Sequence, residues 1–316
     1  MSCILIIFRW NLIAMTKDNF QPLYLKALRS GKLKSISDIG LTRLKECTLC
    51  PRKCGINRVL GEKGICKTGY RAIVSSYSPH FGEEAPLVGY YGSGTIFFTN
   101  CSLLCRFCQN YDISHKSNGK ELTASNLASI MIRLQEMGCH NINLVTPSHV
   151  IPQIIQALYL AAQNGLRIPL VYNSSGYDEL ESLKLLDGLI DIYMPDFKFW
   201  DPEISGDLCG ARDYPEKART SVREMHRQVG NLEIVDGIAR RGLLVRHLVM
   251  PGDMSGTAEI MSFLAREISI DTYVNIMDQY RPCGDIANIS KLVRSITNSE
   301  FEQAVSSAKK VGLWRF

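Results

Sequence analysis

The chain has 316 residues, of which 46% are hydrophobic and 21% are charged, and its formal net charge is +5. This composition is that of a globular protein and excludes a disordered chain. An apolar stretch at residues 3–15 is broken by Arg9 and Asn11, and it is too short for a membrane span and lacks the features of a secretory signal. We therefore expect a cytoplasmic protein without membrane contacts. Residues 1–14 are expected to be a start-site artefact or a loose extension before Met15.

The first part of the chain divides into two segments. Residues 1–46 predict a polar helical extension, helical from Phe20 to Leu44 with a break at Ser30-Gly31. Residues 47–76 form a glycine-punctuated, cysteine-rich segment, and positive charge is concentrated in residues 1–75. A solvated surface, an acidic partner or a negatively charged metal–thiolate centre would each explain this charge. No base-reading motif is present, so no nucleic-acid partner is expected.

Four of the eleven cysteines lie in the cysteine-rich segment, in the pattern C-x2-C-x3-C-x11-C: Cys47, Cys50, Cys54 and Cys66. Without an export signal, grouped cysteines more often bind metal than form disulfides. We expect one metal centre here, and the spacing does not distinguish zinc from an iron–sulfur cluster. A small reduced cysteine-rich turn is the alternative.

Residues 77–316 show strands alternating with helices. The predicted strands are short apolar runs at residues 95–100, 141–146, 169–174, 190–197, 243–250 and 272–277. The predicted helices lie at residues 123–137, 150–164, 178–186, 214–229, 257–267, 286–296 and 299–311. This alternation predicts an α/β domain with a parallel sheet, either doubly wound or curled into a partial barrel. Ligands of such folds gather at the carboxyl ends of the strands.

A second cysteine group follows the first of these strands, with Cys101, Cys105 and Cys108 spaced C-x3-C-x2-C. Three thiolates hold three irons of a [4Fe–4S] cluster, and no fourth cysteine follows at ferredoxin spacing. The fourth iron would then accept S-adenosylmethionine (SAM), whose one-electron cleavage gives a 5′-deoxyadenosyl radical that abstracts hydrogen. A zinc site with His115 as its fourth ligand, or unligated cysteines, are the alternatives.

The remaining cysteines are scattered and are interpreted as buried apolar residues or incidental thiols. They are Cys3, Cys139, Cys209 and Cys283.

The cysteine loop, with Phe107 before its third cysteine, resembles the signature of the radical SAM superfamily. From about Cys47 to the end, the chain resembles the pyruvate formate-lyase activating-enzyme-like group, and within it a subgroup with an N-terminal cysteine-rich segment. The resemblance implies a radical SAM oxidoreductase. Its fold would be a partial (β/α)6 barrel with a small N-terminal cysteine-rich segment.

The resemblance also implies SAM-binding residues at the strand ends. Asn173 and Ser174 would lie near the SAM carboxylate, Asp196 and Lys198 match an Asp-x-Lys motif, and Arg246 would reach the SAM site. The superfamily's Gly-Gly-Glu, which holds the SAM amino group, is replaced by Val-Thr-Pro-Ser-His at residues 145–149. The subgroup carries a Thr-Pro version, whose backbone carbonyls could serve instead. Without the resemblance, Asp-x-Lys at a strand end is more often a plain surface pair.

The sequence therefore predicts a SAM-cleaving radical enzyme that takes electrons from an external donor. The resemblance favours activation of a glycyl radical enzyme, which would be a protein substrate. Radical chemistry on a small molecule, a zinc-stabilised binding module and a simple electron carrier are the alternatives. The missing fourth cysteine at residues 101–108 argues against the carrier.

Overall fold

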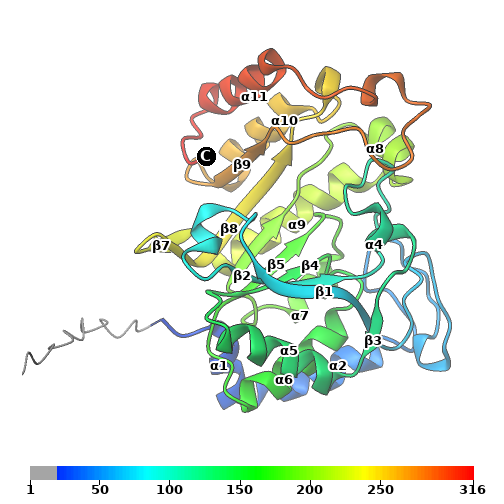
Figure 1. Cartoon of the computed structure of the whole chain (residues 1–316), viewed down its shortest axis with the longest axis vertical. Coiled ribbons are helices and arrows are strands. Elements are labelled where there is room, and N and C mark those ends of the chain that lie inside the picture. Colours follow the sequence, from blue (N-terminus) through cyan, green and yellow to red (C-terminus); the bar gives the residue numbers. More distant parts are fainter. Residues whose placement is uncertain (1–19) are drawn as a thin grey trace, which may run out of the picture.

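The computed structural model describes residues 20–316 of the chain (Figure 1). The predicted extension or start-site artefact at residues 1–14, and Cys3 within it, lie outside the described residues. Within residues 20–316, no helix is both long enough and apolar enough to cross a membrane.

The core of the fold is a nine-stranded sheet in which six strands run parallel. These six strands pair in chain order: β2 (Ser93–Phe98), β4 (Ile142–Val145), β5 (Leu170–Ser174), β6 (Ile192–Pro195), β8 (Ile238–Leu248) and β9 (Tyr273–Met277). All six were predicted, because each is a short apolar run that is largely buried in the sheet. The outer edge of β2 pairs with another strand rather than with β9, so the sheet curls without closing. The fold is the expected partial (β/α)6 barrel.

Helices cover the outside of this sheet, and most were predicted. They are α5 (Ala124–Glu136), α6 (Ile151–Gln163), α7 (Leu180–Leu185), α9 (Tyr214–Val229), α10 (Thr257–Phe263) and α11 (Asn298–Lys310). The last of these begins with a capping box, in which Thr297 and Glu300 satisfy each other's backbone N–H groups. Three short helices were not predicted: α3 (Ala85–Val88), α4 (Tyr111–His115) and α8 (Pro202–Cys209).

The helix predicted at residues 286–296 is wrong, because only a 3₁₀ turn at Ser290–Leu292 forms there. Ile286, Ile289, Val293 and Ile296 have the spacing of an apolar helical face, but Val293 is exposed and Leu292 is buried in its place. The tertiary packing of this segment therefore overrides its helical pattern.

The leader, which is the part of the chain from residue 20 to residue 71, packs against the barrel helices. Helices α1 (Leu23–Arg29) and α2 (Lys32–Thr42) are separated at Gly31, whose φ of 77° is in the left-handed region. The predicted helices and their break are thus confirmed. Helix α2 lies along α6, and Figure 1 shows both leader helices beside α5 and α6. The loops that follow, with a 3₁₀ turn at Arg58–Leu60, run beside α4 and β3.

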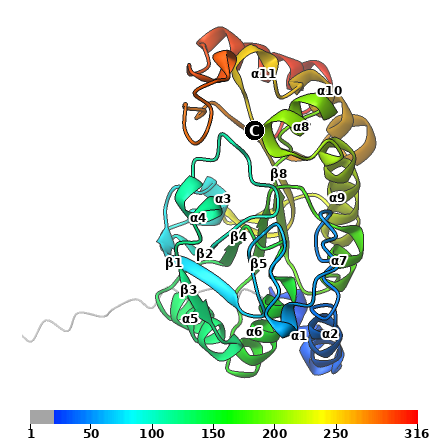
Figure 2. The ribbon, with the colours of Figure 1, turned by 90° about the vertical axis from the view of Figure 1, so that its right-hand side faces the viewer.

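Three strands outside the parallel set were not predicted. β1 (Ala72–His80) runs antiparallel to β2 and also pairs with β3 (Lys120–Leu122), while β7 (Glu233–Val235) forms a hairpin with β8. The expected boundary between residues 76 and 77 therefore falls inside a strand. The view in Figure 2 shows β1 beside the barrel and the leader packed near α7.

Candidate active site

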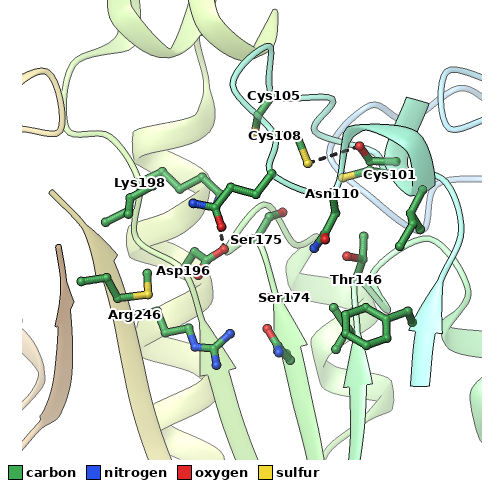
Figure 3. Close-up of a pocket in the computed structure, with 18 of the residues that line it drawn as sticks. Cys101, Cys105, Cys108, Asn110, Thr146, Ser174, Ser175, Asp196, Lys198 and Arg246 are labelled. Atoms are coloured by element: carbon green, nitrogen blue, oxygen red, sulfur yellow. Dashed lines mark hydrogen bonds and ion pairs between the residues drawn. The ribbon is translucent and has the colours of Figure 1, made fainter. Parts of the chain in front are cut away.

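The carboxyl ends of the parallel strands open into one pocket of about 420 Å3, a size that suits a cofactor or small ligand. Figure 3 shows the three cysteines together at one end of this pocket and Arg246 at the other. Every predicted cluster and SAM residue lines it: Cys101, Cys105, Cys108, Asn173, Ser174, Asp196, Lys198 and Arg246. The structure thus brings together residues that are spread over more than 140 positions of sequence.

The cysteine loop leaves β2 through a tightly turned backbone. Leu104 adopts a φ of 58°, a left-handed conformation that is uncommon for a residue with a branched side chain. Two sulfurs already receive hydrogen-bond donors: the backbone N–H of Leu103 donates to Cys101 Sγ at 3.4 Å, and Ser114 Oγ donates to Cys108 Sγ at 3.3 Å. Hydrogen bonds to cysteine sulfurs are one of the levers that set the reduction potential of an iron–sulfur cluster.

The three thiols fit the ligand set of a cluster held by soft donors. Burial, and then the charge of Cys105, raise the pKa of Cys101 to about 12. Burial and Cys105 likewise raise the pKa of Cys108. Three thiolates in this place therefore need cationic iron to compensate their mutual repulsion.

The zinc alternative would use His115 as the fourth ligand of the loop. His115 lies in α4, with Nδ1 2.7 Å from Ser114 Oγ and its ring stacked on Tyr111. In residues 20–316, no three His, Cys, Asp or Glu side chains surround one point closely enough to hold a single metal ion, and this holds for the leader cysteines as well as for the loop.

Two of the scattered cysteines lie beside the loop. The Cys209 thiol, at the end of α8, hydrogen-bonds Cys105 and, together with burial, raises the pKa of Cys105 well above its usual value. Cys283 donates from Sγ to the backbone oxygen of Phe107 at 3.2 Å. Sequence reasoning missed both, and no spacing signal links them to a loop more than 100 positions away.

Lys198 extends into the pocket from the segment after β6. Its Nζ lies 2.5 Å from Asp196 Oδ2. Burial lowers the pKa of Lys198, but the charge of Asp196 raises it, and the pKa is raised overall. The side chain therefore stays an ammonium. An ammonium has three donors, and this ion pair leaves donors for a further carboxylate.

Ser174 is held by the protein at the end of β5. Its Oγ donates to Asp178 Oδ2 at 2.6 Å and accepts from the backbone N–H of Gly176 at 3.1 Å. Asp178 also accepts from Tyr172 at 2.8 Å, so the orientation of Ser174 is fixed. Asn173 lines the pocket from the same strand.

Arg246 forms ion pairs with two carboxylates that sequence reasoning missed. Its Nη2 lies 2.5 Å from Glu83 Oε2, and its Nε lies 2.6 Å from Glu84 Oε1. Asn275 donates to Glu84 at 2.7 Å. Burial raises the pKa of Glu84, but Arg246 lowers it, and the pKa is lowered overall. The carboxylate therefore stays ionised. The adjacent acidic residues Glu83 and Glu84, directly after Gly82, could have indicated a charged site. They were missed because they follow β1, a strand that was not predicted.

Thr146 lies directly after β4, where the resemblance places the superfamily's Gly-Gly-Glu. Its φ is 60°, and its backbone N–H donates to the oxygen of Asn173 at 2.9 Å. Strained backbone of this kind is often kept where a ligand contacts it. Thr146 lines the pocket, next to the labelled strand ends in Figure 3.

A partial barrel with three cysteines on the loop after its first parallel strand defines a class of enzyme. The sequence model of the radical SAM superfamily matches residues 95–264, which is more than half of the chain. The chain therefore belongs to the radical SAM superfamily. Membership implies a [4Fe–4S] cluster and SAM as cofactors, and the thiols and the pocket fit both.

A curated relative matches nearly the whole chain. The chain is 30% identical over 304 residues to an uncharacterised protein of Methanocaldococcus jannaschii, a match that covers 94% of this chain and 84% of that protein.

Two solved structures are also similar. A radical SAM methyltransferase from Sphaerobacter thermophilus shares 14% identity over 70% of this chain, with a TM-score of 0.47. HydG, a maturase of the [FeFe]-hydrogenase, shares 16% identity over 68% of this chain, with a TM-score of 0.48. This chain spans 65% and 48% of those two chains.

Proposed function

We propose that the protein is a SAM-cleaving radical enzyme in which Cys101, Cys105 and Cys108 bind the cluster. SAM would lie against Asn173, Ser174, Asp196, Lys198 and Arg246. The observation that supports this is the sharing of one pocket by three thiols and the charged strand ends. When bound, the cluster and SAM together supply a 5′-deoxyadenosyl radical that abstracts a hydrogen atom from the substrate.

The charges of the pocket suit this cofactor. Asp196 holds the Lys198 ammonium in place, where it can donate to the SAM carboxylate. Three carboxylates line the pocket, from Glu83, Glu84 and Asp196, against the two cations of Lys198 and Arg246. SAM carries a sulfonium, an ammonium and one carboxylate, so a slight excess of negative charge attracts it.

The proposed substrate is a glycyl radical enzyme, from which the radical would abstract a glycine α-hydrogen. This rests on the resemblance to activating enzymes, since a fold alone does not fix a substrate.

The proposal has further parts. The reducing electron would come from an external donor, and the protein would work in the cytoplasm. Cys47, Cys50, Cys54 and Cys66 would bind a second metal centre, zinc or iron–sulfur.

The test begins with protein that is purified and reconstituted without oxygen. Chemical reduction in the presence of SAM should release 5′-deoxyadenosine, and its absence would overturn the radical proposal. A candidate glycyl radical enzyme labelled with α-deuterated glycine should then transfer deuterium into 5′-deoxyadenosine. Label arriving instead only from deuterated small molecules of a cell extract would exclude the activase role and favour the small-molecule alternative.

A further inference from the structure

Arg58 of the leader is a charged side chain that lacks an oppositely charged partner within residues 20–316. It is 0% exposed. Its Nε donates to the oxygen of Gly69 at 2.8 Å, its Nη1 donates to the oxygen of His149 at 2.8 Å, and its buried Nη2 has no hydrogen-bond partner. Within residues 20–316, no carboxylate forms an ion pair with it. An arginine stays protonated in proteins, and a buried charge is unfavourable unless it is paired.

Beyond these two carbonyl oxygens, Arg58 contacts a leader cysteine. Arg58 Nη1 lies 3.9 Å from Cys47 Sγ, and the Arg58 charge also acts on Cys66. Cys47, Cys50 and Cys66 are buried, and Cys54 Sγ lies against Gly64, two residues before Cys66. Arg58 therefore packs against the loops that carry these thiols.

Backbone hydrogen bonds hold the loops that carry these cysteines close together. The N–H of Cys47 donates to Ile56 at 2.9 Å and the N–H of Gly55 donates to Cys47 at 3.0 Å, so the chain doubles back between the first and third cysteines. A side chain at Gly64 would place its Cβ 2.6 Å from Cys54 Sγ. Glycine is thus required there, because the segment that leads to Cys66 passes directly over Cys54.

Four protonated thiols would offer Arg58 no negative charge. Four thiolates around a divalent metal ion, or around the core of an iron–sulfur cluster, carry net negative charge, and binding releases the thiol protons to solvent. We propose that Cys47, Cys50, Cys54 and Cys66 bind a metal centre through four thiolates, and that Arg58 is its buried counter-charge. This inference deepens the second centre proposed above and rests on it. Zinc and an iron–sulfur cluster share this ligand chemistry.

The same segment also forms hydrogen bonds that hold the catalytic loop in position. Arg52, between the second and third leader cysteines, donates from Nε to the oxygen of Ser102 at 2.9 Å and from Nη2 to the oxygen of Cys209 at 2.7 Å. Asn100, next to Cys101, donates from Nδ2 to Thr68 at 3.2 Å. Loss of the second centre should therefore loosen residues 47–71 first and reach the catalytic loop only through these contacts.

The test uses the full chain, purified without oxygen, and measures zinc and iron per chain. The double variant Cys50→Ser/Cys54→Ser should lose one centre, either as zinc or as the iron of one cluster, and keep the cluster of Cys101, Cys105 and Cys108. Cys139→Ser is the matched control, because Cys139 is a buried cysteine in a separate part of the core. Metal contents equal to the wild type in the double variant would overturn the second centre itself.

The role of Arg58 is tested separately, by the rate at which a chelator removes the metal. Arg58→Met should release the metal of the second centre at least tenfold faster than the wild type, whereas Arg58→Lys, which keeps the charge, should stay within about threefold. Release from Arg58→Met at the wild-type rate would refute the counter-charge while leaving the centre in place. If Arg58→Met does not fold, Arg58→Lys carries the test, since its release at ten times the wild-type rate would show that charge is not what matters.

Discussion

The two cysteine groups of this protein are placed in opposite ways. Cys101, Cys105 and Cys108 line a pocket of about 420 Å3 that holds charged side chains, whereas none of the four leader cysteines lines it. One member of the leader group, Cys47, instead lies against the fully buried Arg58. Three ligands beside open space allow a fourth, exogenous ligand, and four ligands in a closed site leave no position for one. Reactivity is thus expected at the first group and a structural or redox role at the second.

The buried arginines of the two regions differ in how their charge is compensated. Arg246 in the pocket is paired with Glu83 and Glu84, so its counter-charge is part of the chain. In the part of the chain that the structure describes, Arg58 of the leader hydrogen-bonds only carbonyl oxygens and a cysteine sulfur. The charge of Arg246 is therefore compensated before any cofactor binds, whereas compensation of Arg58 depends on what the leader cysteines bind.

The largest effect is expected from removing the catalytic thiols. The triple alanine variant of Cys101, Cys105 and Cys108 should lose one cluster and all SAM cleavage, because no cysteine ligands remain in the pocket. Iron content and 5′-deoxyadenosine release under reducing, oxygen-free conditions measure both effects. The metal of the leader should be retained, and continued 5′-deoxyadenosine release would contradict the division of roles between the two groups.

A smaller effect is expected from Arg246→Met, which leaves Glu83 and Glu84 without their partner. Removing one member of a buried ion pair should lower the free energy of unfolding by about 3 kcal/mol. Denaturant unfolding measures it, with Arg223→Met as control, because the exposed pair of Arg223 and Glu267 should contribute at most about 1 kcal/mol. The loss should be the same with and without bound metal. A loss that depends on metal would show that the pocket arginine also relies on the cofactor.

The smallest effect is expected from Lys198→Ala, which removes one cation from the pocket but no cysteine. A charge-assisted hydrogen bond to the SAM carboxylate contributes about 1.5–3 kcal/mol, so SAM affinity should fall about tenfold or more. Titration of SAM into the oxidised protein, which does not cleave it, measures this, and the iron content should be unchanged. Wild-type affinity would show that the ion pair with Asp196 is the main purpose of Lys198.

The sequence allowed the parallel strands to be predicted because each is a short run of apolar residues with clear turns at its ends. The site followed from them, since Asn173, Asp196 and Arg246 each lie at or near the carboxyl end of such a strand. β1 was missed because its second half is exposed or half-buried, which leaves no apolar run. Glu83 and Glu84 were missed with it, as their position depends on how that strand turns back across the open side of the barrel. Cys209 lies beside Cys105 only through the tertiary fold.

One consequence of the short strand β3 concerns self-association. β1 is long, and an uncovered strand of that length offers its free N–H and C=O groups to another chain. β3, which follows the catalytic cysteine loop, pairs with Ala72–Val74 and presents the exposed charges of Lys120 and Glu121 outward. Further along β1, Pro79 has no N–H to donate. This outer edge of the sheet is thus protected against strand addition by neighbouring copies.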